Sequence, residues 1–155
     1  MKTNSTAKEQ SLNPQPVGRP QPQATEVVDQ LDDRVLKALH AAADKKALDV
    51  VVLDLREIAT FTDFFVITSG ANERQVQAIS DEVYDTLKKT GSTAARVEGY
   101  KTAEWILLDY GDFIVHVFEQ KARQFYDLER LWRESKRVEL PTGLFIESGS
   151  LRRES

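Results

Sequence analysis

The residues with the greatest capacity for chemistry lie in one stretch, 101–118, where an indole and an imidazole stand among aliphatic and acidic residues. If Tyr110 and Gly111 form the two-residue loop of a β-hairpin, Trp105 pairs with His116 across the two strands. Side chains two residues apart share one face of a strand. One face of the hairpin, the Trp105 face, then carries Trp105, Leu107, Ile114, His116 and Phe118. Aromatic and aliphatic residues together are typical of the buried centre of a protein–protein interface.

The opposite face of the hairpin is uniformly apolar, as the interior of a domain requires. It carries Ile106, Leu108, Phe113, Val115 and Val117. We therefore predict that this opposite face packs in the core and that the Trp105 face is exposed, with Trp105 as the anchor of a bound partner. Acidic residues near the Trp105 face are expected to contact basic residues of the partner. These are Glu104, Asp109 and Asp112.

Basic and aromatic residues around the hairpin complete the predicted site. Lys101 precedes the hairpin and Arg123 follows it, and both are expected to reach RNA or an acidic side chain at the rim of the site. Tyr126 has two interpretations: it packs a helix against the sheet, or it presents its hydroxyl at the same rim. The other basic residues are dispersed among acids, which is typical of a solvated surface.

The chain shows no group of residues suited to catalysis or metal binding. A catalytic His116 would need a nucleophile or carboxylate partner, and the other histidine, His40, lies on a separate predicted helix. The absence of cysteine excludes disulfides, thiolate ligands and thiol nucleophiles. Nucleotidyl transfer needs closely spaced carboxylates that hold metal ions, and no Asp-x-Asp follows the loop at Thr68 to Gly70. We predict no catalytic residue, no metal site and no cofactor.

Length and charge limit the remaining possibilities. The 155 residues are enough for one ordinary domain with tails, and the formal net charge of −4 argues against a protein that holds DNA or RNA by its own basic surface. The longest apolar runs have the length of strands, so we expect no membrane span. The amino terminus lacks the apolar segment of a secretory signal, which makes the cytoplasm the expected compartment.

Composition divides the chain into three parts. Residues 1–24 hold four of the five prolines together with Gln, Asn and Ser, and are predicted to be a disordered tail. Residues 25–140 carry the apolar periodicity of a folded domain. Residues 141–155 are mostly polar and are predicted to be a flexible tail.

The periodicity of the middle part predicts a compact mixed α/β domain, with a sheet of about five strands and flanking helices. An amphipathic helix is expected over 25–45 with Thr25 as its N-cap. Another follows Asn72, which forms a capping-box pattern with Gln75, and ends at Gly91. The remaining expected elements are strands at 48–55, 63–69 and 95–98, the two arms of the hairpin, and a helix at 122–136.

Five groups of residues, in this order along the chain, resemble the ribosomal silencing factor family, also called Iojap-related. They are Thr62 to Gly70, then Arg74-Gln75, then Glu98-Gly99 ahead of Trp105, then Asp109-Tyr-Gly-Asp112 with Val115-His116-Val117, and finally Tyr126-x-Leu128-Glu129-x-Leu131-Trp132. The resemblance covers about 28–132, which is the whole predicted domain. The Pro-rich amino-terminal segment and the tail after Lys136 lie outside the family core, so no role is carried over to them.

The resemblance implies a nucleotidyltransferase-like architecture without a catalytic role. Members of the family bind ribosomal protein L-fourteen on the large ribosomal subunit, block its association with the small subunit, and reduce translation when nutrients are short. They also form homodimers through a region that overlaps the binding face. The chain is therefore expected to be a translational repressor, with rim contacts to ribosomal RNA. Two alternatives stay open: an adaptor for large-subunit assembly, and an orphan nucleotidyltransferase.

Overall fold

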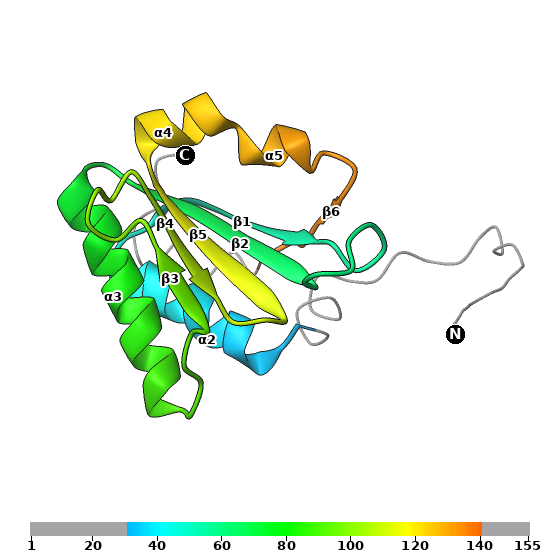
Figure 1. The fold of residues 1–155 in the computed structure, drawn as a ribbon, viewed down its shortest axis with the longest axis horizontal. Coiled ribbons are helices and arrows are strands. Elements are labelled where there is room, and N and C mark those ends of the chain that lie inside the picture. The colour runs from blue at the N-terminus through cyan, green and yellow to red at the C-terminus, as the bar shows by residue number, and fades with distance from the viewer. Residues whose placement is uncertain (1–30, 141–155) are drawn as a thin grey trace, which may run out of the picture.

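The computed structural model describes residues 31–140, which form one mixed β-sheet with helices against both faces (Figure 1). The elements are α2 (Asp33–Asp44), β1 (Leu48–Asp54), β2 (Phe64–Gly70), α3 (Glu73–Lys89), β3 (Arg96–Glu98), β4 (Trp105–Asp109), β5 (Phe113–Glu119), α4 (Gln120–Tyr126), α5 (Leu128–Leu131) and β6 (Lys136–Arg137). The predicted α/β class is confirmed. The predictions for residues 1–24, for 141–155 and for Thr25 as an N-cap lie outside the described residues.

The six strands lie in the order β3-β4-β5-β2-β1-β6. The central pair, β2 and β5, is parallel, and every other neighbouring pair is antiparallel. All seven residues of β2 are buried, because this strand has neighbours on both sides and helices over both faces. The strand beyond the expected five is β6, whose two residues are too short to produce a hydrophobic pattern.

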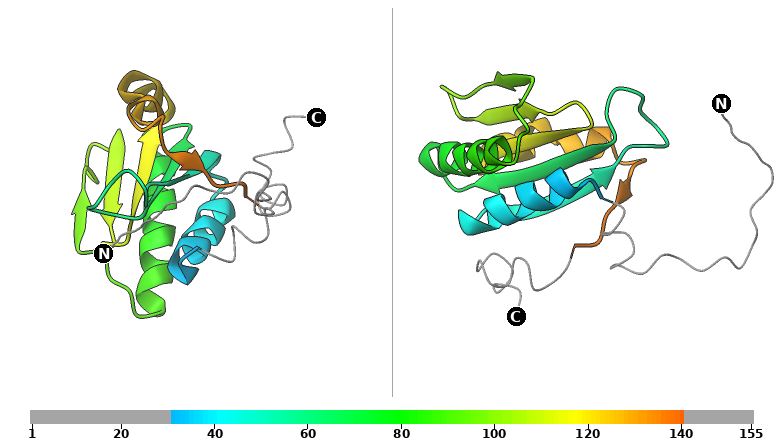
Figure 2. Two further views of the ribbon diagram at one scale, coloured as in Figure 1. Left: turned by 90° about the vertical axis from the view of Figure 1, so that its right-hand side faces the viewer. Right: turned by 90° about the horizontal axis from the view of Figure 1, so that it is seen from below.

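The helices α2 and α3 cover one face of the sheet, and α4 and α5 lie on the other (Figure 2). The helix that was expected over 25–45 begins at Asp33, because the Asp32 carboxylate accepts the Arg34 backbone N–H and caps it. In α3 the Asn72 side chain accepts the Gln75 N–H at 2.8 Å as predicted. The Gln75 side chain reaches back to the N–H of Ala71, one residue before the expected one.

The core between the sheet and α2 and α3 confirms the prediction for the uniformly apolar face of the hairpin. Its five residues, Ile106, Leu108, Phe113, Val115 and Val117, are buried there together with Val35, Leu39, Val76, Ile79, Val83 and Leu87 of the two helices. The helical residues recur at three and four positions, so each helix presents one apolar stripe to the sheet. This layer fixes β4 and β5, and with them the direction of the Trp105 face.

The hairpin of β4 and β5 has a register two residues away from the predicted one. Trp105 pairs with Phe118 and not with His116, and the two-residue loop is Gly111 and Asp112. The reason is that Tyr110 is buried and stacks on the Phe113 ring, with ring centroids 4.9 Å apart, so it stays in the strand. Gly111 takes φ = +86° at the first loop position, where glycine is favoured. Because the shift is an even number of residues, both faces keep their predicted members.

The predicted helix over 122–136 is wrong, since it is divided in two. Asp127 adopts φ = 51° and ψ = 52°, the left-handed conformation that ends a helix, and its N–H bonds the Arg123 carbonyl. The two short helices α4 and α5 then pack over part of the Trp105 face, with Ala122 and Leu128 buried against it. That part of the face is therefore an interior surface.

Candidate partner-binding site

The Trp105 face is open at β4 and closed at β5. Trp105 and Leu107 on β4 are half-buried. Their neighbours on β5 are buried: Ile114, His116, which is 3 % exposed, and Phe118. The prediction that these three residues form an exposed patch is wrong, because α4, α5 and the Trp132 side chain close over this part of the sheet. They support the accessible residues from below.

Trp105 is held from three directions. Its ring stacks on Phe118 with centroids 4.8 Å apart and lies 4.9 Å from the Tyr126 ring of α4. Its indole Nε1–H donates a hydrogen bond to His116 Nδ1 at 3.1 Å. Gly99 precedes it in a turn with φ = +82°, where a Cβ atom would lie 2.0 Å from the Trp105 carbonyl oxygen. The indole is therefore presented in one fixed orientation.

His116 acts as the buried acceptor for Trp105. Because Nδ1 accepts the indole N–H, the neutral ring carries its proton on Nε2, and that nitrogen has no hydrogen-bond partner among the described residues. Burial without a compensating charge lowers the pKa of His116 to about 3. The ring also meets Phe65 edge-on, with centroids 4.5 Å apart. At neutral pH His116 is thus an uncharged structural group.

The accessible part of the face continues onto β3. Arg96 and Glu98 lie opposite Asp109 and Leu107 in the β3–β4 pairing. The residues Arg96, Glu98, Trp105, Leu107 and Asp109 together form what we call the open strip. Arg96 lies 3.4 Å from both the Glu98 and the Asp109 carboxylates. Glu104, exposed beside the strip, adds a further negative charge, so acids outnumber bases here.

The structure separates the other predicted site residues. Tyr126 is exposed and flanks the open strip, while Lys101 is exposed in the turn before β4. Asp112 accepts a hydrogen bond from Arg34 at 2.8 Å, although most of its side chain remains exposed. Asp109 Oδ1 accepts the Gly111 N–H at 2.9 Å. The Asp109 carboxylate therefore helps to build the turn, which is the ordinary role of Asp at such a position. The Asp112 carboxylate instead joins the turn to α2 through Arg34.

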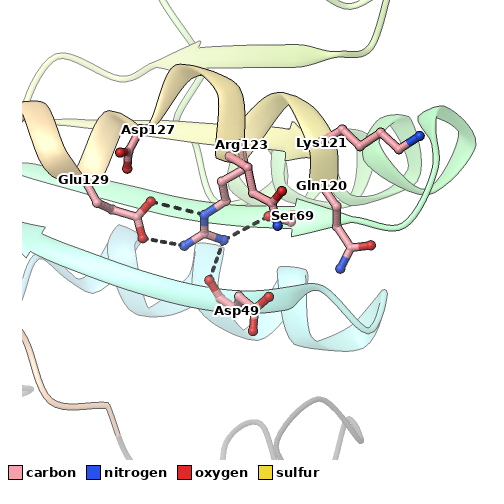
Figure 3. Close-up of a pocket in the computed structure, with 8 residues that line it drawn as sticks. Asp49, Ser69, Gln120, Lys121, Arg123, Asp127 and Glu129 are labelled. Carbon is pink, nitrogen blue, oxygen red and sulfur yellow. Dashed lines mark hydrogen bonds and ion pairs between the residues drawn. The ribbon is translucent and has the colours of Figure 1, made fainter.

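Arg123 does not reach a rim contact, because its guanidinium lies inside the protein (Figure 3). Nη1 donates to the Asp49 carbonyl at 2.6 Å and to Ser69 Oγ at 2.9 Å, and Nη2 donates to Glu129 at 2.8 Å. The side chain is 11 % exposed. Burial alone would raise the pKa of Glu129, but the hydrogen bond from Arg123 keeps it below its ordinary value. Arg123 therefore fastens α4 to β1, β2 and α5.

A polar cavity of about 500 Å³ surrounds this arginine at the ends of β1 and β2. Asp49, at φ = 50°, stands at a bulge in β1 and lines the cavity with Lys121 of α4. The described residues hold no cluster of His, Cys, Asp or Glu that could bind a metal ion. Within the same part of the chain, no helix has the length and apolarity needed to cross a membrane.

Sequence reasoning missed Phe125 and Phe61, two large exposed apolar side chains. Phe125 is 80 % exposed and contacts Tyr126 edge-on. Phe61, in the loop between β1 and β2, packs on the Trp132 ring at 5.8 Å. The sequence does indicate an exposed aromatic residue here, because Phe125 and Tyr126 are adjacent and neighbours on one helix cannot both face the core.

Comparison with known proteins places these features in a family. The family model described as "Ribosomal silencing factor during starvation" matches residues 28–154, so the prediction that the tail after Lys136 lies outside the family is wrong. The chain belongs to this ribosomal silencing factor family. The ribosomal silencing factor of Halalkalibacterium halodurans is 45 % identical over 103 residues, which are 66 % of this chain and 88 % of that protein. That of Bacillus subtilis is 39 % identical over 111 residues, 71 % and 94 % of the two chains.

More distant relatives and solved structures agree with this family. The mouse protein "Mitochondrial assembly of ribosomal large subunit protein 1" is 30 % identical over 91 residues, 57 % of this chain and 40 % of that protein. A crystal structure from Bacillus halodurans is 42 % identical, with a TM-score of 0.63, and the match covers 70 % of this chain and 98 % of that one. One from Chromobacterium violaceum is 31 % identical, with a TM-score of 0.64, covering 70 % and 88 %.

Proposed function

We propose that this ribosomal silencing factor represses translation by binding ribosomal protein L-fourteen on the large subunit and blocking association with the small subunit. Family membership and the names of the bacterial relatives support the ribosomal role. The open strip supports the choice of surface, because it places a half-buried Trp and a Leu beside two carboxylates that share a single arginine, Arg96. The mechanism is steric: the bound protein occupies the place of the small subunit.

The anchor in this proposal is Trp105, flanked by Leu107 and Tyr126. An aromatic side chain that is already fixed by its own domain loses little conformational entropy when a partner covers it, which favours binding. Glu98, Glu104 and Asp109 around it suit a basic partner. Lys101 is exposed in the turn before β4, and we propose that it contacts ribosomal RNA at the rim of the site. Ile114, His116 and Phe118 contribute indirectly, by holding Trp105 in place.

The proposed mechanism needs no catalytic step, cofactor or metal ion. The site works in the cytoplasm, where ribosomal subunits join. In the free protein, Trp105 and Leu107 of the open strip, together with Tyr126 and the exposed Phe125, form an apolar surface that a second copy would cover. We therefore propose a homodimer that competes with ribosome binding.

One relative supports a second candidate, in which the protein is an adaptor for large-subunit assembly. The mouse relative carries assembly of the mitochondrial large ribosomal subunit in its name. Such an adaptor would use the same surface and bind the same particle. It would differ in leaving the association of finished subunits unchanged.

Light scattering of purified subunits tests the proposal. The protein is expected to lower the yield of joined ribosomes, and Trp105→Ala is expected to restore joining, with binding to large subunits weakened about thirtyfold. His40→Ala, at an exposed position of α2 on the other side of the sheet, is the matched control and should act like the wild type. Binding to large subunits with unchanged joining would refute the repressor function and favour the adaptor.

A further inference from the structure

A second candidate site lies on the opposite side of the sheet from the open strip. A groove of about 240 Å³ opens between α3 and the edge formed by β3 and β4. It is lined by Ser80, Asp81, Tyr84, Val97, Tyr100 and Leu108. Pockets for drug-sized ligands have volumes of about 300 to 1,000 Å³, so this groove has room for a group the size of one side chain.

The wall of the groove holds a hydroxyl that lacks a partner. Ser80 is 1 % exposed, and its Oγ has no hydrogen-bond partner among the described residues. Buried hydroxyls are normally hydrogen-bonded, because burial removes their contacts with water. A ligand that enters the groove with a hydrogen-bond donor would satisfy this oxygen.

The mouth of the groove is acidic and aromatic. The Tyr100 hydroxyl donates to Asp81 Oδ2 at 3.0 Å, and this hydrogen bond, together with the charges of Asp81 and Asp85, raises the pKa of Tyr100. The Tyr100 carbonyl accepts the Gln77 side-chain N–H at 2.8 Å, which fixes the loop against α3. The Asp81 carboxylate beside the rings of Tyr84 and Tyr100 suits a cation, through its charge and through the negative faces of the rings.

We propose that this groove receives one lysine side chain of a protein partner. The aliphatic stem of the lysine would lie against Val97 and Leu108, and its ammonium group would donate to Asp81 and Ser80. An acidic, apolar groove of this volume matches the shape and charge of that side chain. The site is independent of the proposed ribosome contact, because the intervening sheet separates it from Trp105.

Titration of the ¹⁵N-labelled full chain with acetyl-Gly-Lys-Gly-amide tests the proposal by NMR. The peptide is expected to shift the amide signals of residues 80–84 and 97–100 in a saturable way, with a millimolar dissociation constant. The norleucine peptide keeps the stem and lacks the ammonium group, so it should bind at least tenfold more weakly. Equal binding of the two peptides, or shifts spread over the whole surface, would overturn the proposal.

Three variants locate the binding. Asp81→Asn should weaken the lysine peptide about tenfold, and Ser80→Ala should weaken it several-fold while leaving the protein folded. Glu82→Gln is the matched control: it removes the same charge from α3 at a residue that does not line the groove. An unchanged affinity in Asp81→Asn would contradict the site. Butylammonium has the stem and ammonium group of lysine without a peptide backbone. If it binds in the groove and the lysine peptide does not, the assignment to a protein partner is wrong.

Discussion

Arg123 provides the sharpest test of how the Trp105 face is built. Its guanidinium joins α4 to the Asp49 carbonyl in β1, to Ser69 in β2 and to Glu129 in α5. Replacing it with Met keeps most of the apolar stem but removes every one of these hydrogen bonds. Arg123→Met is therefore expected to loosen the two helices that cover the face, and with them the Tyr126 ring beside Trp105.

The size of the effect follows from burial. Breaking a buried ion pair by removing one partner costs about 3 to 5 kcal/mol, because the other charge stays buried and unpaired. The Glu129 side chain is 21 % exposed and keeps the Arg137 guanidinium at 3.8 Å, so its charge is only partly unpaired and we expect the lower end, about 3 kcal/mol. In a domain of this size that lowers the melting temperature by about 10 °C or more. Arg123→Lys keeps the charge but loses the fork geometry of the guanidinium, so its stability should lie between those of the wild type and Arg123→Met.

Urea unfolding followed by circular dichroism measures this difference. Lys121→Met, at an exposed position of the same helix, is the control and should change stability by less than about 0.5 kcal/mol. Adding Glu129→Gln to Arg123→Met should recover about 1 kcal/mol, because it removes a carboxylate that has lost its closest partner and keeps only Arg137 at 3.8 Å. A loss below about 1 kcal/mol for Arg123→Met, with no recovery in the double variant, would show that these contacts do not fasten α4 in solution.

Three further predictions follow from individual residues. The pKa of His116 falls from 6.5 to about 3 on folding, so the unfolded chain binds the extra proton. As the pH falls from 6 to 5, the free energy of unfolding should therefore decrease by about 1.4 kcal/mol. In urea titrations at the two pH values, His116→Phe should abolish this decrease, whereas the control His40→Phe should retain it. At Asp127, with its left-handed backbone, Gly should raise stability by up to about 1 kcal/mol and Val should lower it by about 1 to 2 kcal/mol in thermal melts. Glu104→Lys should weaken binding to large subunits several-fold, with a smaller loss at high salt, whereas Glu139→Lys should have no effect in the same sedimentation assay.

The sequence predicted the division of the hairpin into two faces, even though the predicted register was wrong. Alternation with a period of two survives a shift of two residues, so Leu107 and His116 stay together on one face. The exact loop was not predictable from local pattern alone. It depends on burial of Tyr110 against Phe113, which is a property of the packed core.

The accessibility of the Trp105 face could not be predicted, because it depends on contacts between distant parts of the chain. The helical pattern over 122–136 is continuous in sequence, and only the left-handed Asp127 divides it. The two helical pieces are then held over the sheet by Arg123, which bonds a carbonyl 74 residues away. From the sequence alone Arg123 is assigned to the surface, because arginine is seldom buried unless it is paired.

The half-covered face explains how one surface can be both rigid and available. A fully open face would leave five apolar and aromatic residues in water, which favours aggregation, whereas a fully closed one would leave nothing to bind. Here α4 and α5 bury Phe118 and His116, and these two buried rings fix the indole of Trp105 by stacking and by a hydrogen bond. The interior residues of the face therefore set the orientation of Trp105, the anchor in the proposed complex, and the exposed acids around it are the reason for proposing a basic partner.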